Sequence, residues 1–259
     1  MKRKLIFLFG LLGFNPLTTY NFIKGLRFYF RDLKTFKRQL KGNKEFSFVK
    51  YYPILGERFT NSGTLSGQYF YQDLLVAKRI FLNSPQRHAD VASRIDGFVA
   101  HVASFREIEV FDIRPNKSKV SNIKFIQADL MQLPDNMTDY CDSISSLHAI
   151  EHFGLGRYGD PIDAYGHIKA LENIYKILRK GGRFYFSVPM GPQRIEFNAH
   201  RVFDLSYLLK LFENKYQIER FSYVSDAGDL HEDIKLLKDK VVNNFGCVDG
   251  LGIFEFIKI

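Results

Sequence analysis

Apolar residues follow two periodicities in the C-terminal two thirds of the chain, and the two alternate along the sequence. Short apolar runs, which are typical of buried strands, cover residues 88–92, 107–112, 123–128, 143–146, 183–188, 217–223 and 252–257. Helical spacing of apolar residues occurs at 69–81, 95–104, 165–178 and 205–213. This alternation predicts a Rossmann-like, doubly wound α/β fold with a mainly parallel sheet and an antiparallel terminal strand.

The N-terminal part of the chain shows a different helical pattern. Apolar residues at positions 23, 26, 30, 33 and 40 each precede a lysine or arginine at 24, 27, 31, 34 and 41. This spacing predicts a helix with an apolar stripe beside a basic stripe. Turn-forming residues between Pro53 and Gly67 then interrupt the pattern. We therefore predict a basic amphipathic helical appendage at 1–55, a connecting loop and helix at 56–86, and the α/β domain at 87–259.

The positive charge of the protein is concentrated in this appendage. The whole chain carries a formal net charge of +9, and residues 1–50 contain twelve lysines or arginines but only two acidic residues. The rest of the chain is therefore almost neutral. Any partner that the basicity implies is a partner of the appendage and not of the α/β domain.

The amphipathic helix has two main possible settings. Its apolar stripe could enter a membrane interface while its cations contact anionic headgroups, which would involve residues 1–41. Alternatively, the stripe packs on the α/β domain and the cations are solvated. Basic and aromatic residues could also hold RNA, but the sequence has no RNA-binding module, and no nucleic-acid partner is expected.

The chain start and the two cysteines bear on the cellular compartment. Residues 1–14 resemble the start of a signal peptide, but their apolar run is too short to span a bilayer and no clean cleavage site follows. Cys141 and Cys247 lie far apart, which favours a reducing compartment without disulfides or zinc knuckles. The expected location is cytoplasmic, with a possible peripheral position on the inner membrane face.

Candidate chemistry lies where the predicted strands end. In a doubly wound sheet, ligands bind at the carboxyl ends of the strands, near the point where strand order reverses. The first four strands end in the segments DVASRIDG (90–97), FDIRP (111–115), ADL (128–130) and SSLHAIEH (145–152).

These strand ends resemble those of class I S-adenosylmethionine-dependent methyltransferases. The resemblance rests on Asp112 at the end of the second strand, the Asp-Leu pair after the third, and Leu-His-Ala-Ile-Glu-His after the fourth. LENIYKILRKGGRFYFSVP (171–189) is similar to the helix, Gly-Gly turn and fifth strand of that superfamily. GQYFYQDLLVAK (67–78), SRIDGFVAHVASF (93–105) and FDIRP are similar to a small, mostly bacterial methyltransferase-like family of unknown function. That closer likeness spans the whole chain and implies a place in surface-polysaccharide biosynthesis.

The resemblance implies S-adenosylmethionine as the cofactor. Asp112, with Ile113 beside it, would accept hydrogen bonds from the ribose hydroxyls. Asp129 and the Leu130 backbone would face the adenine amino group. The methionine portion would lie along the first strand end, at Asp90, Ala92, Ser93 and Gly97.

Further positions complete the expected site. Ser146 and His148, after the fourth strand, would border the sulfonium and the acceptor. Tyr69 and Gln72 lie on the helix before the first strand, which commonly closes over the cofactor in this superfamily.

The first strand end departs from the superfamily pattern. Ala92 and Arg94 occupy positions where glycines are expected, and only Gly97 remains. Alanine adds one methyl group, whereas Arg94 could point away, pair with Asp96 or Asp112, or block the cofactor. For Asp112, the alternative to a cofactor role is a structural salt bridge.

The histidines after the fourth strand allow several interpretations. His148-x-x-Glu151-His152 matches the inverted zinc-protease motif, but glycines follow closely, so no long zinc-binding helix and no metal are expected. Instead, His148 or His152 could take the acceptor's proton, with Glu151 orienting one of them. Alternatively, Glu151 and His152 only support the loop.

Later in the chain, His200 and Arg201 lie where the superfamily often places acceptor contacts. They could instead belong to the entry of the next helix, together with Asp204.

The leading hypothesis is therefore O-methylation of a sugar or glycan intermediate near the membrane. The alternative is a degenerate, non-catalytic Rossmann module that binds a nucleotide, a nucleotide sugar or a partner protein.

Overall fold

The computed structural model describes residues 15–42, 45–46, 48, 50–63, 65–132 and 135–259. The chain divides after residue 64 into an N-terminal unit and a C-terminal unit. The signal-like segment at 1–14 lies outside the described residues. The helix expected at 69–81 belongs to the C-terminal unit, so the structure places it with the α/β fold and not in a connecting segment.

The N-terminal unit is built on one long helix, α2 (Pro16–Gln39), where the two stripes predicted a helix. One face of α2 packs against the chain that follows it. The rings of Phe28 and Phe59 meet edge to face, 5.9 Å apart. Gly25 lies so close to the backbone of Leu55 that a Cβ atom would overlap it. A single turn of 3-10 helix, η1 (Glu57–Phe59), completes this contact.

The other two faces of α2 differ in chemistry. At three- and four-residue spacing, one face presents an apolar arc of exposed or half-buried side chains: Phe22, Ile23, Leu26, Tyr29, Phe30, Leu33 and Phe36. Beside the arc runs a basic stripe: Lys24, Arg27, Arg31, Lys34 and Arg38. Among the described residues, no helix is both long enough and apolar enough to span a membrane.

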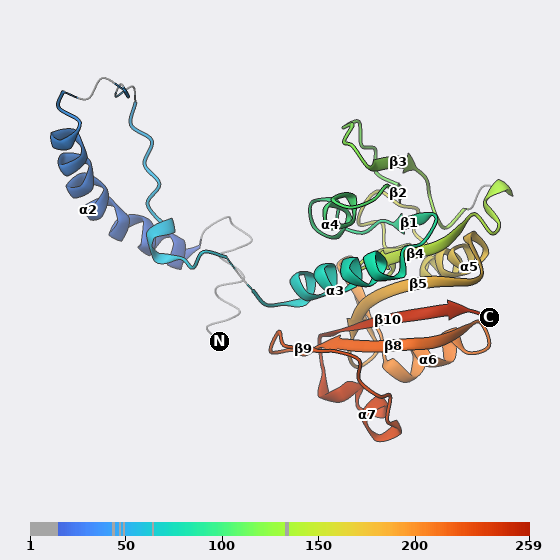
Figure 1. Cartoon of the computed structure of the whole chain (residues 1–259). Helices are drawn as coiled ribbons and strands as arrows, with labels where there is room; N and C mark the ends of the chain where they lie inside the picture. The colour runs from blue at the N-terminus through green and yellow to red at the C-terminus, as the bar shows by residue number, and fades with distance from the viewer. Residues whose placement is uncertain (1–14, 43–44, 47, 49, 64, 133–134) are drawn as a thin grey trace. The chain divides into compact units, whose positions relative to one another are not determined.

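The C-terminal unit is built on one eight-stranded sheet in the order β3-β2-β1-β4-β5-β10-β8-β9 (Figure 1). The first five strands in this order are parallel, and β10 runs antiparallel between β5 and β8. The strands are β1 (His88–Val91), β2 (Ile108–Asp112), β3 (Ile123–Gln127), β4 (Cys141–Leu147), β5 (Leu178–Met190), β8 (Tyr216–Val224), β9 (Leu230–His231) and β10 (Gly250–Lys258). A separate hairpin pairs β6 (Arg194–Glu196) with β7 (His200–Val202). The predicted fold class is confirmed, including the antiparallel strand.

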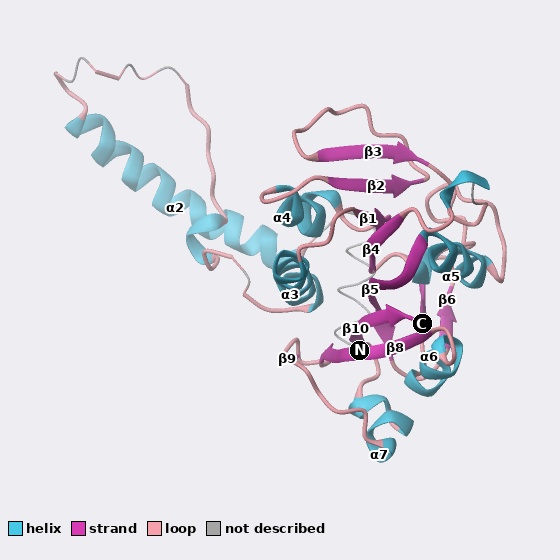
Figure 2. Cartoon of the chain, turned by 45° about the vertical axis from the view of Figure 1, so that its right-hand side comes forward, coloured by secondary structure: helices cyan, strands magenta, loops and turns pink. Residues whose placement is uncertain are grey.

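Helices cover both faces of this sheet (Figure 2). One face carries α3 (Gln68–Asn83), the π-helical turn η2 (Ile95–Val99) and α4 (Ala100–Ala103). The other carries α5 (Gly166–Ile177) and α6 (Leu205–Phe212). Shorter elements are η3 (Asp135–Met137), η4 (Ile150–His152), α7 (Lys238–Val242) and η5 (Asn244–Gly246).

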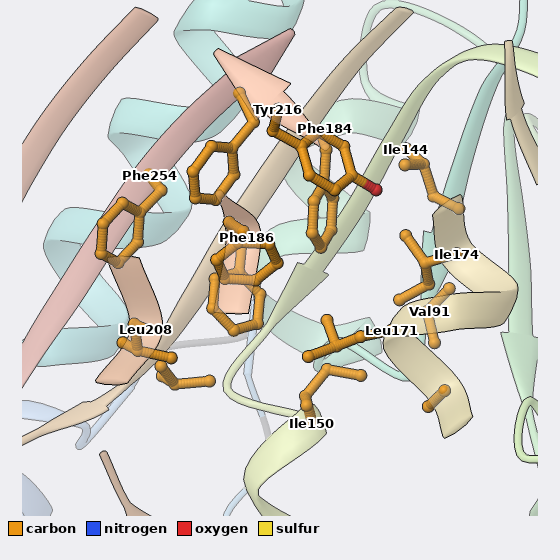
Figure 3. Packing of buried hydrophobic residues seen from close by; sticks show 14 of the residues in the cluster. Val91, Ile144, Ile150, Leu171, Ile174, Phe184, Phe186, Leu208, Tyr216 and Phe254 are labelled. Atoms are coloured by element: carbon orange, nitrogen blue, oxygen red, sulfur yellow. The ribbon is translucent and has the colours of Figure 1, made fainter. Parts of the chain in front are cut away.

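The two faces have separate apolar cores because side chains alternate along β5. Phe184 and Phe186 point toward the face covered by α5 and α6, where they pack with aromatic residues of β10 such as Phe254 (Figure 3). Tyr185, between them, packs with Ile80 of α3 on the opposite face. The register pairs Phe254 with Phe186 directly across the strands. This aromatic cross-strand packing ties β10 into the interior of the sheet.

Two predicted elements differ in detail from the structure. The helix expected at 95–104 is broken, because Gly97 adopts non-helical angles (φ −123°, ψ −106°) within the π turn that precedes α4. The fifth strand begins at Leu178 rather than Arg183 and includes an irregularity, because the register opposite β4 shifts between Leu178 and Arg183. Gly181, at φ +75°, lies within this irregular stretch.

Candidate active site

A two-part cavity opens at the carboxyl ends of β1, β2, β3 and β4. The inner part holds about 50 Å³ and is lined by strand-end residues that include Ala92, Asp112, Asp129 and His148. The outer part holds about 390 Å³ and shares Ala92, Asp112 and His148 with the inner part. The four strand ends that the sequence selected therefore converge on one cavity.

The end of β1 is shaped by a buried hydrogen-bond network. Ala92 adopts φ +57°, a left-handed conformation that glycine adopts at lower cost, which explains why glycine is expected there. Directly below it, the buried carboxylate of Asp90 accepts hydrogen bonds from the Ser93 hydroxyl and the Ser145 hydroxyl, both at 2.6 Å. Burial raises the pKa of Asp90 to about 6. Asp90 and Ser93 thus stabilise the turn after β1 by hydrogen bonds beneath it, and they do not line the cavity.

The carboxylate of Asp112 is covered by an arginine. Arg114 Nη2 and Nε lie 2.5 and 2.9 Å from the two Asp112 oxygens. The guanidinium also lies over the ring of Tyr158, with 4.4 Å between the guanidinium carbon and the ring centroid. The sequence did not identify Arg114 or Tyr158 as site residues, although Arg114 lies within the FDIRP segment. Together they cover the Asp112 carboxylate at this edge of the cavity.

The end of β3 supplies an acidic residue and an apolar surface. Asp129 accepts a hydrogen bond from the Met131 backbone at 2.9 Å, which fixes its side chain in the turn. Leu130 is buried, and its carbonyl accepts a hydrogen bond from Asn173 of α5. Asp129, Leu130 and Ile113 all line the inner cavity.

His148 is clamped from three sides. Its Nδ1 lies 2.7 Å from Oε1 of the fully buried Glu151, and its Nε2 lies 3.0 Å from Oε1 of Gln68. The ring stacks on Tyr69 with 4.6 Å between centroids. Its backbone is left-handed, at φ +51°. The structure therefore brings the predicted residues His148, Glu151 and Tyr69 together, and adds Gln68.

His152 and His200 differ in how close they come to the cavity. His152 lines the inner part, and its Nδ1 lies 2.7 Å from the carbonyl oxygen of Ala199. His200, on β7, does not line the cavity; its ring centroid lies 6.4 Å from that of His152. Its Nε2 lies 3.7 Å from Glu196 Oε2. Arg201 is buried and donates to the Phe153 carbonyl oxygen at 2.6 Å, so it supports the loop after η4.

The inverted zinc-protease motif needs both histidines on one long helix. Here the segment forms only the single turn η4, and His148 lies before this turn in a left-handed backbone conformation. Within the described part of the chain, no three His, Cys, Asp or Glu side chains gather as a metal site.

The glycine-rich loop after η4 places Tyr158 over the cavity. Asp160 organises this loop by accepting hydrogen bonds from the backbone N–H groups of Gly154, Gly156 and Tyr158. Gly154 adopts φ +76° and lies against the Asp163 carbonyl, so a side chain there would clash.

Three other predicted cofactor contacts lie behind the cavity surface. Gln72 accepts a hydrogen bond from Ser187 at 2.6 Å and donates to Asp73. Gly97 lies against Asp73, where a Cβ atom would stand 2.6 Å from Oδ2 of that carboxylate. Ser146 donates to the Val91 carbonyl oxygen inside the sheet. These residues and Ser93 support the site rather than line it.

Arg94 does not block the cavity. Its guanidinium forms a bidentate pair with Asp96, at 2.6 and 3.0 Å, on the exposed rim. Of the alternatives left open by the sequence, this is the pairing that the structure shows.

Comparison with solved structures supports the same fold. The 1,6-didemethyltoxoflavin-N1-methyltransferase of Burkholderia thailandensis, solved with S-adenosylhomocysteine, has a TM-score of 0.50 and 15% identity; the match covers 72% of this chain and 78% of that one. The N-methyltransferase NodS of Bradyrhizobium japonicum WM9 has a TM-score of 0.50 and 12% identity, over 73% and 96% of the chains. The [4+2]-cyclase SpnF has a TM-score of 0.50 and 13% identity, over 73% and 80%. The fold is thus shared with methyltransferases and also with a cyclase, so the fold alone does not define the reaction.

No curated protein matches the sequence. One family model, described as "Caenorhabditis protein of unknown function, DUF268", matches residues 92–244, which contain most of the cavity residues. The match spans more than half of the chain, and the chain belongs to this DUF268 family.

Proposed function

We propose that the protein is an S-adenosylmethionine-dependent methyltransferase that acts on a hydroxyl group of a sugar or glycan intermediate. The observation that carries the proposal is the convergence of Ala92, Asp112, Asp129 and His148 on one cavity at the switch point of the sheet. Each of these residues ends a different strand.

The lining residues fit the parts of this cofactor. The Asp112 carboxylate can accept hydrogen bonds from two ribose hydroxyls once Arg114 moves aside. Asp129 can accept from an adenine amino group, with Leu130 and Ile113 as apolar walls. When bound, the cofactor supplies an electrophilic methyl group.

The reaction asks little of the protein beyond alignment and proton removal. An acceptor oxygen held about 3 Å from the methyl group and a nearby base can suffice. His148, backed by Glu151, is a suitable base, because a buried carboxylate fixes the ring and stabilises it after it takes a proton.

A sugar acceptor agrees with the rim of the cavity. Tyr69 and Tyr158 line the outer part, and aromatic faces commonly pack on sugar rings. Arg94 and Arg114 add hydrogen-bond donors on the same rim. The polysaccharide role is proposed from the sequence resemblance.

A second candidate is a non-catalytic nucleotide-binding module. The specific observation that favours it is the ion pair between Arg114 and Asp112, which occupies the carboxylate that a cofactor ribose would need. In this alternative, the pair is permanent.

We also propose that α2 holds the protein on the anionic inner face of the membrane. The exposed apolar arc could enter the interface while the basic stripe contacts lipid headgroups. This arrangement needs no membrane-spanning helix.

Calorimetric titration of the full-length protein with S-adenosylmethionine and S-adenosylhomocysteine tests the catalytic proposal. We expect micromolar binding of both, and a loss of about tenfold or more in Asp112→Ala, because a charged hydrogen bond is removed. Asp112→Asn, which keeps the size of the side chain, should also bind weakly.

Glu196→Ala is the matched control. Glu196 pairs with Arg194 two residues away, as Asp112 pairs with Arg114, but it lies outside the cavity lining. Absence of binding by the folded wild-type protein would contradict the proposal and favour the second candidate.

A further inference from the structure

Hydrogen bonds distinguish the two histidines that line the inner cavity. His152 Nδ1 donates to the Ala199 carbonyl oxygen, and its Nε2 lies 3.6 Å from Oε1 of Glu151. Burial lowers the pKa of His152, which favours a neutral ring. His152 therefore connects the loop after β4 to the β6–β7 hairpin and is poorly placed to hold an extra proton.

His148 has the arrangement of a base. The Glu151 carboxylate can only accept hydrogen bonds, so the proton between them belongs to His148 Nδ1. The nitrogen that can exchange a proton with a ligand is then Nε2. Tyr69 stacks on the face of the His148 ring and restricts rotation of the ring, so that Nε2 stays directed at the hydrogen-bond partner it has in this structure.

That partner is the side-chain oxygen of Gln68. The Gln68 amide group donates to the Asp249 carbonyl oxygen at 2.8 Å, which fixes its orientation and leaves Oε1 facing His148 Nε2 at 3.0 Å. Oxygen acceptors therefore face both ring nitrogens. A hydrogen bond from Nε2 to Gln68 therefore occupies the same ring nitrogen that would exchange a proton with a ligand.

Gln68 can leave this position without disturbing the sheet. It is the first residue of α3 and is half-exposed. Gly67 before it adopts φ +95°, with open space where a Cβ would lie. Among the described residues, hydrogen bonds to Asp249 and His148 hold its side chain.

We infer that His148 is the base for the acceptor hydroxyl and that the Gln68 side-chain oxygen occupies the place that this hydroxyl takes. The inference rests on the proposed methyl transfer. The acceptor oxygen forms its bond to the methyl carbon, the carbon–sulfur bond breaks with its electron pair going to sulfur, and the hydroxyl proton passes to His148 Nε2. Before the acceptor arrives, the Gln68 oxygen takes up the hydrogen-bonding position at Nε2. The acceptor atom must therefore be a hydrogen-bond donor.

Nuclear magnetic resonance of full-length protein with ¹⁵N-labelled histidine tests this inference without a known acceptor. A His148→Asn variant identifies the His148 ring signals, and the Nε2 chemical shift is compared at one pH in the wild type, Gln68→Leu and Gln68→Glu. In the described part of the chain, the titratable groups beside this ring are Glu151, His152, Asp73 and the stacked Tyr69, and neither Gln68 variant replaces any of them.

We expect the His148 Nε2 signal to shift in Gln68→Leu at constant pH, because this nitrogen loses its hydrogen-bond partner. Gln68→Glu keeps an acceptor oxygen and should keep the hydrogen-bonded Nε2 signal. Signals of His101 and His231 serve as controls and should not change.

An unchanged His148 Nε2 signal in Gln68→Leu would overturn the inference. Titration of the same samples with S-adenosylmethionine separates this failure from a failure of the proposed function. Absent cofactor binding with the expected His148 shifts would contradict the methyltransferase proposal, whereas normal cofactor binding with unchanged His148 signals would contradict only the role of Gln68.

Discussion

At the scale of single residues, two arginines each pair with an aspartate two positions away, and their effects on the cavity are opposite. Arg94 pairs with Asp96 on the rim and leaves the cavity open. Arg114 pairs with Asp112 and lies over Tyr158. Obstruction of the cavity, one of the alternatives for Arg94, is therefore not what the structure shows, whereas Arg114 covers a carboxylate of the cavity lining.

Replacing Arg114 should expose the Asp112 carboxylate. We expect Arg114→Met to bind S-adenosylhomocysteine about three- to tenfold more tightly, because the ligand no longer competes with a partly exposed ion pair. Arg94→Met, which loses a similar pair outside the inner cavity, should change the affinity little. Calorimetry with both variants makes the comparison. Weaker binding by Arg114→Met would mean that the guanidinium contacts the ligand.

The site residues at strand ends could be predicted from the sequence, whereas the residues that contact them from other positions could not. Asp112, Asp129 and His148 follow apolar runs, so the sheet topology alone brings them to one edge. Gln68 and Arg114 contact the site only because of the direction in which their side chains point. The apolar periodicity of the sequence does not predict that direction. Gln72 was expected at the cofactor because its helix lies nearby, but its side chain turns inward to Ser187.

At the scale of elements, the long periodic segments were predicted well because burial of one face determines them. The β6–β7 hairpin was missed because three-residue strands are too short to show alternation. The irregular start of β5 was also missed, since Gly181 and Gly182 indicate a turn whether or not a strand continues through them.

The apolar arc of α2 allows a test of membrane binding with the full chain. Phe30→Glu places a charge in the arc, whereas Thr35→Glu adds the same charge on an exposed position outside it. For vesicles containing phosphatidylglycerol, we expect Phe30→Glu to reduce binding by more than about tenfold, because apolar burial and one unit of charge are both lost. Co-sedimentation measures this effect.

Thr35→Glu should lose only about fivefold, as the electrostatic change alone predicts. Vesicles of uncharged phosphatidylcholine should bind all forms weakly. Equal losses in the two variants would indicate that the arc does not enter the interface.

At the scale of the whole molecule, buried carboxylates make stability depend on pH. Burial raises the pKa of Asp73 from 3.8 to about 6. The folded chain therefore keeps this proton to a higher pH than the unfolded chain does. The free energy of unfolding should fall as the pH rises through the window from about 4 to 6.

Asp73→Asn removes this dependence. We expect the variant to match the wild type near pH 4 and to exceed its free energy of unfolding by roughly 2 kcal/mol at pH 8. Urea denaturation at both pH values measures the difference. A difference that is the same at both pH values would show that Asp73 does not titrate as described.

The position of β10 has a consequence for biosynthesis. The ribosome makes β8 before β10, yet β8 joins the sheet only through β10, which lies between it and β5. Until β10 emerges from the ribosome, the edge of β5 and the edge of β8 that β10 later pairs both lack a hydrogen-bonded neighbour. The parallel half of the sheet, which supplies the cavity, can assemble earlier. The strand ends that line the cavity can therefore form in a nascent chain before β10 is made. At that stage the edge of β5 is unpaired and prone to aggregation, so it requires protection.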